Sequence, residues 1–271
     1  MRTVLPALLL LVGCGPDNIR SLTVESEHTG ETYLLEVLSP EGSADSEALP
    51  TVYVLDGYYH FDALAKHVHR RWKRDDLAPF RLVGVGYKGL DIKDVSDLSV
   101  IDDKRTVDLS FPEHEGGNYA EGGGGDLFHA ALSEELVPAI DALYETDPDQ
   151  QTLMGHSLGG HFVLLDPLLF APHSSVFTTI VSASPSIWWA DGSVLAYEQE
   201  RAEDPDGLPF HLIIGTGTME GTEMNAPKEA LVRNLRSRNH AGLQITELNP
   251  KAGHMDAAEA IFEDALAEVH P

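Results

Sequence analysis

One stretch decides the fold of this chain: Gln151-Thr152-Leu153-Met154-Gly155-His156-Ser157-Leu158-Gly159-Gly160. Its first four residues are typical of a short buried strand, and the apolar residues after Gly160 are typical of the start of a helix. A Gly-x-Ser-x-Gly sequence between a strand and a helix is a nucleophile elbow, whose sharp turn holds the serine hydroxyl clear of the sheet. Small residues on both sides of the serine let strand and helix approach closely. The pattern therefore predicts that Ser157 is a nucleophile.

Segments typical of strands and helices alternate on both sides of this elbow. Strand-like runs occupy residues 21–25, 32–37, 51–55, 82–85, 151–154, 176–183, 210–214 and 243–248. One helix-like run directly follows the elbow. The others occupy residues 60–74, 127–144, 194–201, 227–238 and 255–269. A hairpin followed by β/α alternation predicts an α/β fold, with an eight-stranded, mostly parallel sheet covered by helices on both faces. We expect one domain, spanning residues 21–271.

A long connection interrupts the alternation. Residues Lys88 to Asp126 show no periodic segment, and they include Gly116-Gly117 and the run Gly122–Gly125. Connections of this length in compact domains are usually functional or disordered. Because the segment precedes the helix that leads to the elbow, we expect it to face the substrate; a disordered surface insertion is the alternative.

The composition is that of a globular protein with a strongly acidic surface. The chain has 271 residues, 42% hydrophobic and 23% charged, with a formal net charge of −26. Such a charge argues against a nucleic-acid partner and against electrostatic docking on anionic lipid. The short basic run Arg70-Arg71-Trp72-Lys73-Arg74 fits a solvated helix end.

The N-terminus has the pattern of a bacterial lipoprotein signal. A short apolar segment from Val4 to Val12, too short to span a bilayer, ends at Leu11-Val12-Gly13-Cys14, which resembles a lipobox. We expect residues 1–13 to be a cleaved signal peptide, Cys14 to be acylated, and residues 14–20 to form a tether. The resemblance, with Gly15 after the cysteine, implies an outer-membrane location in the cell envelope. An ordinary signal peptide with an incidental cysteine is the alternative.

A serine nucleophile needs a base, and the base needs an orienting acid. With such an elbow the order along the chain is serine, acid, histidine, each after a strand. His254 follows the last strand-like run, and Glu220 follows the seventh. We expect Ser157, Glu220 and His254 to form the triad. Glu223 and Asp256 are rival acids, and a dyad without an acid is a further alternative.

Two backbone N–H groups should form the oxyanion hole. We expect one from Leu158, directly after the nucleophile, and one from the turn containing Gly57 and Tyr58, after the third strand-like run. A tight turn without a catalytic role is the alternative there. Trp188 and Trp189 either line the substrate pocket or pack in the core.

The remaining histidines do not form a metal-binding pattern. His67 and His69 lie two apart on an expected helix and so face different sides. His156 and His161 flank the elbow and should be packed or hydrogen-bonded there. The single cysteine, Cys14, excludes a disulfide within one chain and a two-cysteine metal site. We expect no metal and no other cofactor.

Several stretches together resemble a known family, the bacterial α/β-hydrolases grouped with ferric-enterochelin and salmochelin esterases and more distantly with S-formylglutathione hydrolase (esterase D). The resemblance is carried, in chain order, by residues 51–57, 105–112, 134–160, 182–189 and 253–254. It implies an α/β-hydrolase fold and the serine and histidine roles given above. It also implies that Arg105 points into the site and contacts an anionic group or an oxyanion.

The chain departs from this family in two respects. The segment Gly215-Thr216-Gly217-Thr218-Met219-Glu220 stands where the family usually has a Gly-Glu-x-Glu-like segment. The assignment of Glu220 as the triad acid therefore depends only on its position along the chain. The strong negative charge does not suggest a pocket for a ferric siderophore, because such ligands are themselves anionic. Siderophore hydrolysis is therefore one option among small esters.

These observations favour a serine ester hydrolase that acts on a small-molecule ester through an acyl-enzyme, with a membrane contact only through the lipid anchor. An acyltransferase with the same triad is an alternative, in which an alcohol or amine replaces water. A non-catalytic surface binding protein that keeps this fold is a second alternative.

Overall fold

The computed structural model describes residues 18–111, 122–170, 175–202 and 207–271. Within these ranges an eight-stranded sheet forms the centre of the molecule, with the strand order β1-β2-β4-β3-β5-β6-β7-β8. The strands are β1 (Ile19–Glu25), β2 (Thr32–Leu38), β3 (Leu49–Val54), β4 (Arg81–Tyr87), β5 (Thr146–His156), β6 (Thr179–Ala183), β7 (His211–Gly215) and β8 (Gln244–Glu247). The expected eight strands are all present.

The sheet is mostly parallel. β1 pairs antiparallel with β2 and β2 antiparallel with β4, whereas all pairs from β4 through β3 to β8 are parallel. The order reverses at β3, whose neighbours are β4 and β5. In open α/β sheets, ligands bind at the carboxyl ends of the strands beside such a switch point. The sequence-based expectation of an α/β-hydrolase sheet is confirmed, and its topology places a site beyond β3 and β5.

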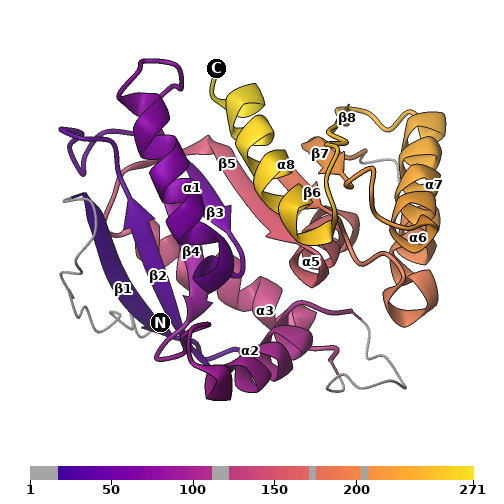
Figure 1. Cartoon of the computed structure of the whole chain (residues 1–271), viewed down its shortest axis with the longest axis horizontal. Helices are drawn as coiled ribbons and strands as arrows, with labels where there is room; N and C mark the ends of the chain where they lie inside the picture. The colour runs from indigo at the N-terminus through magenta and orange to yellow at the C-terminus, as the bar shows by residue number, and fades with distance from the viewer. Residues whose placement is uncertain (1–17, 112–121, 171–174, 203–206) are drawn as a thin grey trace.

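Helices cover both faces of the sheet (Figure 1). They are α1 (Gly57–Trp72), α2 (Val95–Asp108), α3 (Gly125–Ala131), α4 (Val137–Asp141), α5 (Leu158–Phe170), α6 (Trp189–Arg201), α7 (Thr222–Arg238) and α8 (His254–Val269). α1 and α8 run side by side over one face. Their apolar residues, including Phe61 and Phe262, pack on alternate strand residues such as Val52 and Met154.

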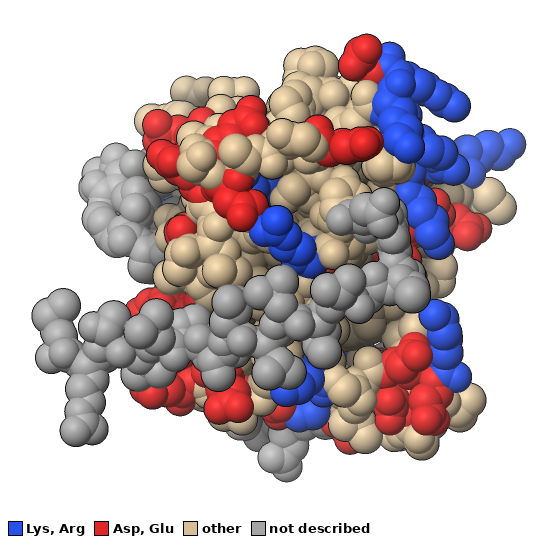
Figure 2. All heavy atoms as spheres, turned by 90° about the vertical axis from the view of Figure 1, so that its left-hand side faces the viewer, with Lys and Arg blue, Asp and Glu red and all other residues tan. Residues whose placement is uncertain are grey.

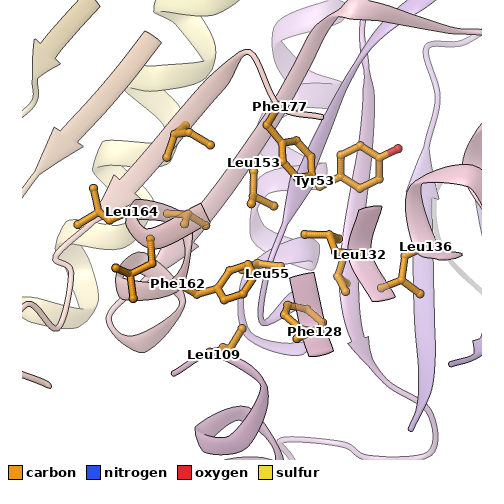
Figure 3. Packing of buried hydrophobic residues seen from close by; sticks show 14 of the residues in the cluster. Tyr53, Leu55, Leu109, Phe128, Leu132, Leu136, Leu153, Phe162, Leu164 and Phe177 are labelled. Atoms are coloured by element: carbon orange, nitrogen blue, oxygen red, sulfur yellow. The ribbon is translucent and has the colours of Figure 1, made fainter. Parts of the chain in front are cut away.

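The opposite face carries the larger core. Its centre is formed by Tyr53, Leu55 and Leu153 of the sheet with Phe128 and Phe162 of α3 and α5 (Figure 3). Adjacent residues of β3 therefore face opposite cores, as the two-residue period of a strand requires. Burial on both sides explains why the central strands are continuous apolar runs.

The structure differs from the sequence-based expectation in the connection after β4. The segment from Lys88 to Asp126 was expected to lack regular structure, but it contains the 14-residue helix α2. Asp94 caps this helix, because its Oδ1 accepts hydrogen bonds from the backbone N–H and the hydroxyl of Ser96. Only a few residues of α2 are buried, so its sequence lacks the apolar stripe that predicts a helix. Residues 112–121, which include Gly116-Gly117, lie outside the described ranges.

The helix expected over 127–144 is divided. A π-helical turn, Leu132–Leu136, separates α3 from α4. Pro138 has no N–H to donate to the carbonyl four residues earlier, which locally breaks the α-helical hydrogen-bonding pattern. The run Gly122–Gly125 has a packing role: a Cβ on Gly125 would lie 2.3 Å from the ring of Phe111.

Charge is unevenly distributed over the surface. Acidic side chains are spread over the face shown in Figure 2, and basic ones gather at its upper right. The basic run ends α1, where Arg70, Lys73 and Arg74 are exposed, as expected for a solvated helix end. None of the helices in the described residues is long and apolar enough to cross a membrane.

The first strand begins far from the switch point. Ile19 pairs with Leu38, and Leu38 pairs with Leu82 near the start of β4. Because β3, β4 and β5 are parallel, the start of β4 and the end of β5 lie at opposite edges of the sheet. The N-terminal residue of β1 is therefore at the edge opposite Ser157.

Candidate active site

The elbow has the geometry that its sequence predicts. β5 ends at His156, α5 begins at Leu158, and Ser157 between them has a φ of 58°. This left-handed conformation is strained for a non-glycine residue, and it lifts the side chain above the sheet. A Cβ on Gly155 would lie 2.3 Å from the carbonyl oxygen of Gly159, so the turn requires glycine there.

Three side chains from separate loops meet beyond the strand ends. Nε2 of His254 lies 3.1 Å from Oγ of Ser157, and Nδ1 of the same ring lies 2.8 Å from Oε2 of Glu220. Ser157 follows β5, Glu220 follows β7, and His254 follows β8. A base must lie within hydrogen-bond reach of the nucleophile and of its orienting acid, and both distances meet this requirement.

Glu220 is held rigidly. Its side chain is 2% exposed, and Oε1 accepts hydrogen bonds from the hydroxyl of Ser184 and the backbone N–H of Gly217, both at 2.6 Å. The second oxygen is thereby left directed at His254. The rival acids Glu223 and Asp256 are exposed on the first turns of α7 and α8. Of the three candidates, Glu220 is the one whose carboxylate contacts the imidazole of His254.

The expected oxyanion donors lie at two helix starts. Leu158 is the first residue of α5, and Gly57 and Tyr58 are the first two of α1. The first N–H groups of a helix have no carbonyl partner within that helix, so such groups are suited to an anionic oxygen. A Cβ on Gly57 would lie 2.9 Å from the backbone nitrogen of Val85, which explains the glycine.

Arg105 is held by a carboxylate at the edge of the site. Its Nε and Nη2 donate to the two oxygens of Asp56 at 3.1 and 2.7 Å, and the hydroxyl of Tyr58 donates to the same carboxylate. Burial opposes ionisation of Asp56, but the guanidinium and the Tyr58 hydroxyl outweigh it and lower the pKa. The carboxylate lies against the elbow, since a Cβ on Gly159 would be 3.3 Å from Oδ2. A substrate anion would therefore compete with Asp56 for Arg105.

The two tryptophans have different environments. Trp189 is fully buried in the larger core, whereas Trp188 is 38% exposed. Between them and the elbow lies Ser186, whose hydroxyl is 3.3 Å from that of Ser157. Trp189 therefore packs in the core, whereas the ring of Trp188 is partly exposed to solvent.

His156 packs against His254, contacting both its ring and its backbone. Its ring lies 4.6 Å from that of His254, measured between centroids, and its Nε2 is 3.0 Å from the backbone carbonyl oxygen of His254. Burial, together with the neighbouring His60 and His254, lowers the pKa of His156 to about 3. At neutral pH the ring is thus uncharged, so it donates to the carbonyl without adding a cation beside His254.

Two of the other histidines, His67 and His161, have protein partners. Nδ1 of His67 lies 2.6 Å from Glu263, and Nε2 of His161 lies 3.2 Å from the carbonyl oxygen of Phe111. Among the described residues, no group of three or more His, Cys, Asp or Glu side chains is arranged to hold a metal ion.

Sequence analysis missed several contributors to this site. Asp56 was considered only as part of a turn, and its ion pair joins residues 49 positions apart. Ser184 and Ser186 lie within the family-like stretch 182–189, but no spacing rule indicates their partners. A carboxylate directly after a buried strand, beside a glycine, was the available signal for Asp56.

A protein-family model described as a putative esterase matches residues 26–271. The chain belongs to this family. The esterase is 27% identical over 263 residues to the ferri-bacillibactin esterase BesA of Bacillus subtilis, covering 92% of this chain and 88% of the relative. It is 28% identical to the apo-salmochelin esterase of Escherichia coli, covering 85% of this chain and 72% of that protein. Among solved structures, the BES protein of Bacillus cereus aligns with a TM-score of 0.80 at 24% identity over 97% and 98% of the two chains, which establishes the shared fold.

These findings identify the protein as a carboxylic ester hydrolase of the branch that contains siderophore esterases.

Proposed function

We propose that the esterase cleaves its ester through a covalent acyl-enzyme formed on Ser157. The observation that carries the proposal is the continuous line of hydrogen-bonding groups from Ser157 through His254 to Glu220. His254 takes the serine proton as Oγ attacks the acyl carbon, and it then delivers that proton to the leaving alkoxide. Water, activated by the same imidazole, releases the acid and restores the serine.

Glu220 holds the imidazole in the tautomer with the proton on Nδ1 and stabilises the imidazolium that forms. Its own two donors, Ser184 and Gly217, keep the carboxylate in place during this step. The N–H groups of Leu158 and of the Gly57–Tyr58 turn hold the oxyanion, whose negative charge is greatest in the tetrahedral intermediate.

The substrate class that we propose is a siderophore-type ester. The names of both relatives support it, since one acts on ferri-bacillibactin and the other on apo-salmochelin. The acidic surface favours the metal-free ligand over an anionic ferric complex, because like charges repel during encounter.

The decisive experiment combines a probe with a substrate panel. Wild-type protein should react with a fluorophosphonate at Ser157 and should hydrolyse a trilactone siderophore and p-nitrophenyl esters. Ser157→Ala and His254→Ala should each lower kcat by at least ~10⁴-fold with the fold intact. Equal labelling of Ser157→Ala and wild type would refute the assignment. An acyltransferase would instead transfer the acyl group mainly to a dilute added alcohol, giving more new ester than free acid although water is in large excess.

A further inference from the structure

An open groove of about 150 Å³ lies between α1 and α8. Side chains from both helices line it, among them Tyr59, His60, Ala63, Met255, Glu259 and Phe262. The lining is thus mostly aromatic and apolar, on a protein whose surface is otherwise strongly acidic.

The groove adjoins the catalytic groups at two points. Met255 directly follows His254 at the start of α8. Tyr59 follows Tyr58 of the oxyanion turn, and the centroids of these two rings are 4.8 Å apart. Between these points, the ring of His60 lies 5.6 Å from that of His156, which itself contacts the ring of His254. A group bound in the groove would therefore contact residues that directly follow His254 and the Gly57–Tyr58 turn in the chain.

The chemistry of the lining selects against an anion. Neither lysine nor arginine lines the groove, and Glu259 places an exposed carboxylate at its edge. Burial lowers the pKa of His60 to about 4, so this ring is neutral at physiological pH. An anionic ligand would therefore meet a carboxylate and find no cation to pair with.

The same lining favours an aromatic ring. Tyr59 and His60 are partly exposed and supply ring edges and faces, which prefer tilted or stacked aromatic partners, and the buried ring of Phe262 packs beneath His60. Met255 is 64% exposed, and its thioether can contact a bound ring and lose that exposure. The volume of the groove, about 150 Å³, is large enough for a benzene ring.

We propose that this groove is a substrate subsite that binds an uncharged aromatic ring of the ester. The inference rests on the proposed function, because it assigns the ring of the same ester to the groove between the helices that begin at the Gly57–Tyr58 turn and at His254. It assigns to α1 and α8 a role in selecting the substrate as well as in covering the sheet.

Filling the groove tests the proposal. Ala63 is exposed on α1, so Ala63→Trp should fold and occupy the groove with its own ring. Ala196→Trp is the matched control, at an exposed position of α6 on the opposite face of the sheet. The kcat/KM values would be measured for ethyl acetate, benzyl acetate and ethyl benzoate, which separate an alkyl ester from rings on the alcohol and acyl sides.

We expect Ala63→Trp to lower the ratio of aromatic to alkyl kcat/KM at least tenfold, for benzyl acetate, ethyl benzoate or both. Ala196→Trp should leave the ratios at the wild-type value. Ratios that do not change in Ala63→Trp would overturn the subsite while leaving the proposed function intact. If wild type cleaves none of the esters and no fluorophosphonate reacts at Ser157, the proposed function itself fails.

A binding measurement tests the charge preference without turnover. On Ser157→Ala protein at pH 7, ligand-observed NMR titration should show benzyl alcohol binding at least tenfold more tightly than benzoate. The difference should disappear when Ala63→Trp is added to Ser157→Ala. Tighter binding of benzoate, or equal binding of the two, would contradict an uncharged ligand.

Discussion

The carboxylate of Glu220 lies 2.8 Å from Nδ1 of His254, although the two residues are 34 positions apart on different loops. Its other oxygen is occupied by Ser184 and Gly217, so the carboxylate cannot rotate away without leaving two donors unsatisfied. The imidazole is thereby given one orientation before any substrate binds.

Replacing this acid should be costly to catalysis. Glu220→Gln keeps the shape but removes the charge that stabilises the imidazolium, so we expect kcat to fall by roughly 10²–10⁴-fold. Glu223→Gln and Asp256→Asn are matched controls at exposed positions, and each should stay near the wild-type kcat. Steady-state kinetics on a p-nitrophenyl ester measures all three. A larger loss in either control than in Glu220→Gln would show that the acid is misassigned.

Arg105 should act through Asp56. Removing the guanidinium leaves the Asp56 carboxylate buried and unpaired beside the elbow, a change that typically costs about 3–5 kcal/mol. We therefore expect Arg105→Ala to lower both the free energy of unfolding and kcat for neutral and anionic esters alike.

A double variant provides the control for this prediction. Asp56→Asn combined with Arg105→Gln removes both charges, and it should be more stable to denaturant than Arg105→Ala alone. The opposite kinetic outcome is a rise in KM confined to anionic esters. It would show that a substrate anion displaces Asp56 and binds Arg105 directly.

Acid should destabilise the fold through its buried histidines. Burial lowers the pKa of His161 to about 4 from an unfolded value near 6.5. The unfolded chain therefore binds a proton that the native state does not, and the stability contributed by neutral His161 is lost as pH falls from about 6.5 to 4. The slope from one such group is at most about 1.4 kcal/mol per pH unit.

The slope of stability against pH distinguishes this effect from loss of packing. His161→Gln keeps a donor for the Phe111 carbonyl but cannot be protonated, so the plot of unfolding free energy against pH should become flatter below pH 6.5. Burial raises the pKa of Asp108 to about 6 and acts in the opposite direction in both proteins. His69→Gln on α1 is the matched substitution. An unchanged slope in His161→Gln would contradict the prediction.

Membrane attachment remains a prediction from sequence, because Cys14 lies outside the described residues. If Cys14 is acylated, it carries the acyl chains that anchor the protein, and stable anchoring requires more than one such chain. Cys14→Ser removes their attachment point, so this variant should leave the membrane fraction or accumulate as an unprocessed precursor in the native host. Intact-mass analysis measures the modification directly. An unmodified mature protein containing a free Cys14 would exclude the anchor.

Sequence patterns predicted the sheet well because its strands are short apolar runs separated by helices. The elbow was predictable for a different reason: Gly155 and Gly159 are required by contacts within a few residues. Order along the chain then located His254 and Glu220, since loops at the carboxyl ends of parallel strands must converge.

Patterns failed where the determining contact is distant or where packing provides little signal. α2 buries too few residues to show a helical stripe, so the sequence analysis did not predict it. The pairing of Arg105 with Asp56 depends on how α2 packs beside the end of β3, which no local rule specifies. The π-helical turn before Pro138 likewise follows from a single missing donor within an otherwise regular helical pattern.

The position of β1 has a practical consequence. Ile19 begins this strand at the edge of the sheet opposite Ser157, and the antiparallel pairing of β1 with β2 fixes it there. A bead, sensor surface or fusion protein joined directly ahead of Ile19 would therefore leave the catalytic edge facing the surrounding solution. Immobilised preparations joined in this way should retain access for large esters, whereas coupling through Met219 or Met255, both exposed beside the triad, should obstruct it.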